Sequence, residues 1–200
     1  QQGARVVDPD SITIPEGRPD HGLVVVGSHV GLTTTQLRAV QRRGTLAELE
    51  IHVPSVLDAR REEHLAEVAA RAQQTLASSD CVVYTSRDLV AADDPAESLA
   101  IARSVSDAVV EVVRRVRAAK PAWVVAKGGI TSHEVAENGL GIRRARVEGQ
   151  FWPGQVSLFS AQEAPDEVMG APYVVFPGNV GGEQALADVV DVLTAAVDAR

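Results

Sequence analysis

The sequence contains few residues of the types that build disulfides and metal sites. Its single cysteine, Cys81, excludes an intrachain disulfide and a metal site made of cysteines alone. Cys81 opens an apolar run typical of a buried strand, so we expect it to act as a small hydrophobic residue. The five histidines lack the short, regular spacing of zinc ligands, so the sequence predicts no dedicated metal site.

The chain also lacks an excess of positive charge and any long apolar run. Its formal net charge is −8, whereas a nucleic-acid-binding surface requires clustered basic residues. No apolar stretch approaches the roughly 18–20 residues that cross a bilayer. The first residues lack the basic flank and apolar segment of a signal peptide. We therefore expect a cytoplasmic protein that binds neither nucleic acid nor membrane.

What the sequence does contain is an alternation of strand and helix patterns. A hydrophobic fraction of 45% in 200 residues is enough for one domain with a substantial core. We expect strands at 23–27, 48–53, 81–86, 122–127, 144–151, 156–160 and 172–176, and helices at 34–43, 59–77, 94–119, 132–138 and 182–198. This alternation predicts an α/β fold with a mainly parallel sheet covered by helices.

The apolar content of the strands and the composition of the chain start refine this prediction. Near-continuous apolar runs, typical of interior strands, occur at 23–27, 81–86, 122–127 and 172–176. Residues 141–160 hold two strand patterns without a helix between them, which predicts a short antiparallel edge. Residues 1–22 are polar and punctuated by proline and glycine, as linkers are, so the domain is expected to span 23–200.

Three of the predicted strands end in glycine and lead into a helix. The turns begin at Gly27, at Gly128-Gly129 and at Gly178. Glycine lets the backbone approach a ligand closely, and a helix N-terminus presents free N–H groups to an anion. In open α/β sheets, ligands bind beyond the carboxyl ends of the strands. Each glycine alone also fits an ordinary strand end, but the three together predict one anion- or nucleotide-binding site.

The residues of the three turns do not by themselves identify the ligand. The segment from Gly27 to Gly31 lacks the Lys-Ser/Thr ending of a P-loop, and no Gly-x-Gly-x-x-Gly follows a strand. Lys127 precedes the second turn and fits a phosphate contact, an ion pair or a solvated side chain equally well. His29 and His133 fit turn residues that are hydrogen-bonded or face solvent better than they fit catalytic bases.

Two further patterns have structural explanations. Thr33 and Gln36 have the spacing of a helix capping box. Arg144 and Arg146 share one face of a strand pattern, where charge discourages pairing between exposed sheet edges. For the arginines, we favour this explanation over a role in ligand binding.

Several blocks of the sequence resemble the four-carbon acid sugar kinase family. Its members include 3-oxo-tetronate and threonate/erythronate kinases, and some have been labelled type III effector Hrp-dependent outer proteins. The most specific blocks are Lys-Gly-Gly-Ile-Thr-Ser at 127–132 and Phe-Pro-Gly-Asn-Val-Gly at 176–181, and those at 27–30 and 152–154 agree. The resemblance covers about residues 20–198 and matches only the C-terminal, nucleotide-binding half of such kinases.

This resemblance implies a ligand and its contacts. The ATP contacts that it implies are Ser28, Gly128, Gly129, Ile130, Thr131, Ser132, Gly178 and Asn179. The resemblance also implies that ATP, bound with Mg²⁺, donates the phosphoryl group to a four-carbon sugar acid. The N-terminal half of such kinases holds the sugar acid, and we expect that missing half to supply the catalytic base as well.

A second class of function fits the same turns. A non-catalytic module could bind a nucleotide or a phosphorylated metabolite and act through a partner. The sequence leaves open which sugar acid is used and whether the chain forms a homo-oligomer. We expect these 200 residues alone to bind nucleotide and to catalyse nothing.

Overall fold

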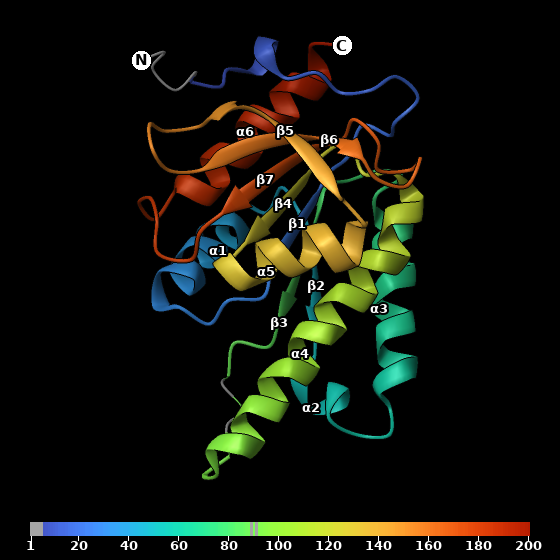
Figure 1. Ribbon diagram of the computed structural model, residues 1–200, viewed down its shortest axis with the longest axis vertical. Coiled ribbons are helices and arrows are strands. Elements are labelled where there is room, and N and C mark those ends of the chain that lie inside the picture. The colour runs from blue at the N-terminus through green and yellow to red at the C-terminus, as the bar shows by residue number, and fades with distance from the viewer. Residues whose placement is uncertain (1–5, 89, 91) are drawn as a thin grey trace.

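The computed structural model describes residues 6–88, 90 and 92–200 and has an α/β fold (Figure 1). Its seven strands form one sheet in the order β2-β3-β1-β4-β7-β6-β5. The first five strands in this order are parallel, and β6 and β5 continue the sheet as antiparallel strands. The predicted mainly parallel sheet with an antiparallel edge is therefore confirmed.

The elements follow the predicted order along the chain, except that a short helix at 53–56 was not predicted. The strands are β1 (Leu23–Val26), β2 (Ala47–Ile51), β3 (Cys81–Thr85), β4 (Val124–Lys127), β5 (Arg144–Gln150), β6 (Ser157–Glu163) and β7 (Pro172–Phe176). The α-helices are α1 (Gly31–Arg43), α2 (Val53–Val56), α3 (Arg61–Thr75), α4 (Pro95–Val116), α5 (Gly129–Glu134) and α6 (Ala185–Asp198). Short 3₁₀ helices span Pro9–Ser11 (η1) and Arg117–Ala119 (η2), and a π-helix (η3) spans Val135–Leu140. None of the helices in the described residues combines the length and the apolar character that a bilayer crossing requires.

Helices cover both faces of the sheet, which explains why its interior strands are apolar throughout. Val24 and Val125 point toward α1 and α6, in a core that also holds the fully buried ring of Trp123. Val25 and Val83 point to the opposite face, into a core shared with α3 and α4. Successive side chains of a strand alternate between faces, so both sets of positions must be apolar. The four strands expected in the interior, namely β3, β1, β4 and β7, all have neighbours on both sides.

The antiparallel edge ends in β5, whose outer side is charged. Arg144 and Arg146 are exposed on this last strand of the sheet, as expected for residues that discourage edge pairing. The edge is covered at one end, where the N–H of Val7 donates a 2.9 Å hydrogen bond to the carbonyl of Gln150. Val6 forms a parallel bridge with the same residue.

The described part of the chain start packs on the domain, although its composition is that of a linker. We call residues 6–22 the N-terminal strap. Val7, Ile12 and Ile14 belong to the core on the α6 side. The buried guanidinium of Arg18 donates hydrogen bonds to three backbone carbonyls, those of Pro121, Glu167 and Met169. The apolar residues of the strap are too few to establish a helix or strand period, so the sequence did not indicate their burial.

Two helices begin earlier than their sequence patterns indicated. α1 begins at Gly31, so Thr33 and Gln36 lie inside the helix and form no capping box. The helix expected at 132–138 begins at Gly129 and continues as the π-helix to Leu140. In both places the helix starts directly at a glycine turn, three residues before the expected start.

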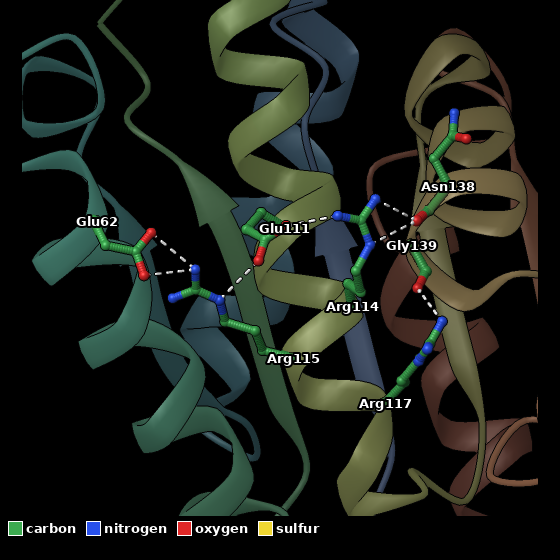
Figure 2. A network of polar contacts seen from close by, with 7 residues as sticks. All are labelled: Glu62, Glu111, Arg114, Arg115, Arg117, Asn138 and Gly139. Carbon is green, nitrogen blue, oxygen red and sulfur yellow. Dashed lines mark hydrogen bonds and ion pairs between the residues drawn. The ribbon is translucent and has the colours of Figure 1, made fainter.

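A network of arginines fixes α4 between its neighbours (Figure 2). Arg115 pairs with Glu62 of α3 at 2.8 Å and with Glu111 of α4 at 2.9 Å. Arg114 and Arg117 donate hydrogen bonds to the carbonyls of Asn138 and Gly139 in the π-helix. These carbonyls lie in the last turn of the helix and lack partners within it. The network therefore sets the position of α4 relative to the helical segment that begins at Gly129.

Candidate nucleotide-binding site

The three glycine turns meet at one edge of the sheet. Val26, Lys127 and Phe176 are the last residues of three adjacent parallel strands and lie in register. The connection after β1 leads to β2 at one edge of the sheet, whereas the connection after β3 passes β1 and leads to β4, which lies on the opposite side of β1. This reversal is where ligands bind in open α/β sheets. A cavity of about 700 Å³ opens there, a size that suits a small-molecule ligand.

The first turn is tied to the end of β3. The carbonyl of Ser28 accepts a 2.9 Å hydrogen bond from Nη1 of Arg87, and the Ser28 hydroxyl accepts one from the N–H of Val30. Nε2 of His29 lies 3.0 Å from the carbonyl of Ser86, which can only accept, so Nε2 carries a proton. Burial lowers the pKa of His29, so its ring is neutral near pH 7. His29 is thus a hydrogen-bonded turn residue with an uncharged ring.

The second turn combines a strained backbone with an open approach. Gly128 has a φ of +120°, and a Cβ there would lie 2.8 Å from the Cβ of Ser28, so only glycine fits. A Cβ at Gly129 would meet no atom within 4 Å. Gly129, Ile130 and Thr131 form the first turn of α5, so their N–H groups have no carbonyl partner within the helix. The turn therefore presents free backbone donors beside open space.

Ser132 has a different place from the residues before it. Its hydroxyl donates to the carbonyl of Ala126 at 2.7 Å, and its N–H donates to the carbonyl of Gly128 at 2.8 Å. Its own carbonyl accepts a 2.6 Å hydrogen bond from the buried hydroxyl of Tyr173. These contacts occupy Ser132 in attaching α5 to β4 and β7.

Two side chains of α1 hold the third turn. The hydroxyl of Thr33 donates to the carbonyl of Gly178 at 3.0 Å. Nε2 of Gln36 donates to the carbonyls of Val180 and Gly182, at 2.9 and 2.8 Å. Both side chains are fully buried, so these polar contacts form out of reach of water. The residues that we took for a capping box therefore shape the site.

The contact of Thr33 with the third turn leads to a testable expectation. Thr33→Val keeps the shape of the side chain but leaves the carbonyl of Gly178 without its donor. We expect the free energy of unfolding to fall by about 1–2 kcal/mol, as measured by urea denaturation. Thr35→Val is the matched control, because Thr35 is exposed on the same helix, and its effect should stay within about 0.5 kcal/mol. Equal effects of the two substitutions would contradict this role of Thr33.

The wall of the cavity opposite the turns is apolar. It is formed by one side of α4 with single residues from other segments, namely Ile101, Ala102, Val105, Val109 and Val110 with Val53, Val90 and Val135. An apolar wall facing a few convergent polar groups is typical of sites for ring-containing ligands. The sequence did not indicate this wall, because apolar residues that line a cavity have the same helical spacing as those that pack in a core.

Two carboxylates also line the cavity. They belong to Asp88, after β3, and to Glu134, at the end of α5. Within residues 6–88, 90 and 92–200, no three histidine, cysteine, aspartate or glutamate residues are grouped as a metal site would require. A Mg²⁺ ion bound together with phosphates keeps several waters and needs only one or two protein carboxylates. The donors present thus fit Mg²⁺ carried by a nucleotide better than a metal ion held by the protein alone.

Most of the contact residues implied by the resemblance lie together. Those that line the cavity are Ser28, Gly128, Gly129, Ile130, Thr131, Gly178 and Asn179. Ser132 lies behind the second turn. His133 is 69% exposed and pairs with Glu137 on the surface, outside the cavity lining. Sequence reasoning missed Arg87 as a support of the first turn, since an arginine after a strand carries no signal of burial.

Comparison with known proteins identifies the family of the domain. Residues 23–186 match the family model described as the nucleotide-binding C-terminal domain. No curated protein matches the sequence at a significant level. The family match includes the three glycine turns and the apolar side of α4, so it spans the whole cavity.

Solved structures share the fold. A Bordetella bronchiseptica protein, a domain of unknown function crystallised with citrate as a domain-swapped dimer, has a TM-score of 0.69 and 22% identity over 88% of this chain. A Salmonella typhimurium protein has a TM-score of 0.64 and 20% identity over 86%, and a Haemophilus influenzae protein has 0.62 and 17% over 94%. The chain spans 41% of the length of each. The family match confirms the resemblance to the nucleotide-binding half of four-carbon acid sugar kinases, and the chain belongs to the family of nucleotide-binding C-terminal domains.

Proposed function

We propose that this domain binds ATP with Mg²⁺ and is the nucleotide-binding part of a kinase that phosphorylates a four-carbon sugar acid. The observation that carries the proposal is the meeting of three glycine turns around one cavity with an apolar wall. Phosphates would lie on the turns, and the base would lie against α4. The family to which the chain belongs supports the nucleotide. The bound citrate of the Bordetella protein, a small hydroxy acid, supports an acid as the second substrate.

The residues of this chain would act by binding and orienting the nucleotide. Free N–H groups of Gly129, Ile130 and Thr131 would donate to phosphate oxygens, and Ser28 would add a hydroxyl contact. Gly178 and Asn179 would shape the pocket on the β7 side. Mg²⁺ would neutralise charge on the phosphates, because phosphoryl transfer depends on positioning and electrostatic stabilisation. The group that deprotonates the sugar acid would belong to a second domain.

Calorimetry with a small panel of ligands tests the nucleotide site. We expect ATP and ADP to bind the domain in the presence of Mg²⁺, while threonate and erythronate alone produce no heat of binding. The reason is that the glycine turns present donors for phosphate, whereas the acid would contact the other domain. Binding of a phosphorylated metabolite without binding of ATP or ADP would favour the non-catalytic module instead.

A further inference from the structure

The side chain of Lys127 is fully buried at the end of β4, directly before the second glycine turn. Its Nζ donates a 2.5 Å hydrogen bond to the carbonyl of Pro177 and lies 4.1 Å from the centre of the Phe176 ring. The side chain thus reaches across from β4 to the start of the third turn. The sequence left three roles open for Lys127, and its burial excludes the solvated one.

The ammonium group of Lys127 lacks a negative partner in the described part of the chain. No carboxylate of the residues described lies within the 4.0 Å of an ion pair. Burial alone lowers the pKa of this lysine to about 8, and no charged neighbour contributes to the shift. A buried cation is costly unless an anion offsets it. The carbonyl and the aromatic ring offset only part of that cost.

The position of Lys127 relates this charge to the cavity. It lies in register between Val26 and Phe176, and a glycine turn begins within two residues of each of these three strand ends. Its hydrogen-bond partner, Pro177, is adjacent to Gly178 of the cavity lining. A second link joins the same turns, because the N–H of Gly128 donates to the carbonyl of Phe176 at 2.8 Å. The unpaired ammonium group therefore lies beside the start of the third turn, although Lys127 is not itself among the residues that line the cavity.

We propose that Lys127 is a positioning residue of the site and its built-in positive charge. It fixes the third turn through Pro177, and its unpaired ammonium group favours ligands with phosphate groups over uncharged nucleosides. This inference rests on the proposed nucleotide site. It assigns to one side chain part of a preference for anions that the free N–H groups at the start of α5 also contribute to.

Substitution by methionine separates the charge from the packing. Lys127→Met keeps a long, flexible side chain over the Phe176 ring but removes the ammonium group. We expect ADP affinity to fall about tenfold or more, while adenosine affinity changes less than about threefold. Lys120→Met is the matched control, because Lys120 is the only other lysine, is exposed and precedes β4 at its amino end. A purely structural role of Lys127 would weaken ADP and adenosine equally, and that result would overturn the proposal.

A titration of the unmodified protein gives a second test that does not depend on a folded variant. Because the chain has only two lysines, selective ¹³C labelling gives two side-chain signals, which Lys120→Met assigns. We expect saturation with ADP to raise the pKa of Lys127 from about 8 by at least about one unit, and adenosine to leave it unchanged. An unchanged pKa in bound ADP would overturn the inference. If ADP does not bind the unmodified domain at all, the proposed function fails instead, so the two failures are distinct.

Discussion

Gly129→Val is expected to abolish ADP binding while leaving the domain folded. A Cβ at this position would meet no atom within 4 Å, so the substituted side chain would not clash with the protein. The same open space is where phosphates would approach the free N–H groups at the start of α5. Two additional methyl groups would occupy that path. Calorimetry should show no heat of ADP binding, while circular dichroism and the unfolding midpoint remain close to those of the unmodified domain.

The neighbouring glycine and a smaller side chain provide the controls. Gly129→Ala should fold normally and lose only part of the affinity, because one methyl group fills less of the path. Gly128→Ala should destabilise the domain by roughly 2 kcal/mol or more, because its φ of +120° strains an alanine and its Cβ would lie 2.8 Å from that of Ser28. Unchanged ADP affinity in a folded Gly129→Val domain would mean that nucleotide binds elsewhere.

The second large effect concerns catalysis. We expect residues 1–200 to bind ATP with Mg²⁺ and yet to release no ADP in response to a four-carbon acid. Kinases exclude water from the transferred phosphoryl group by closing one part of the protein over another. Orientation of the reacting groups contributes roughly 7–11 kcal/mol to lowering the barrier, and the cavity walls described here hold no group assigned to the acid. A coupled assay that detects ADP, run with threonate or erythronate as the acid, measures this release.

The matching positive experiment adds a second domain. The chain spans 41% of each of the three solved structures with its fold, so the comparison uses this domain joined to a sugar-acid-binding domain of the kind found in four-carbon acid sugar kinases. We expect acid-dependent ADP release only from the joined protein, and Gly129→Val should eliminate it. Turnover by the isolated 200 residues would contradict the proposal and would direct attention to His29 of the cavity lining.

The sequence predicted the sheet because the physics of buried strands is local. A strand covered on both faces must be apolar at every position, and this pattern identified β1, β3, β4 and β7 without knowledge of their neighbours. The glycine turns were equally accessible, since parallel strands bring their carboxyl ends to one edge. The N-terminal strap was not, because Ile12 and Ile14 are buried by contacts distant in sequence and form too short a pattern to indicate a strand.

Only those parts of the site that the backbone forms could be predicted from the sequence. Glycines at strand ends marked the turns, whereas the supporting side chains carried no distinguishing pattern. Thr33 and Gln36 had the spacing of a capping box and instead hold the third turn, because α1 begins three residues earlier than its apolar pattern. The Lys127 side chain lies over the Phe176 ring because β4 pairs with β7, and the sequence of β4 alone does not show which strand is its neighbour.

The N-terminal strap has a practical consequence for anyone who produces this domain. The family match begins at residue 23, which makes residue 23 an obvious place to start a shortened protein. Such a protein would lose Val7, Ile12 and Ile14 from the core beside α6, and it would lose the hydrogen bond that covers β5 at Gln150. An uncovered apolar helix face beside an open strand edge promotes aggregation. We therefore expect a protein that keeps the strap to aggregate less than one that starts at residue 23.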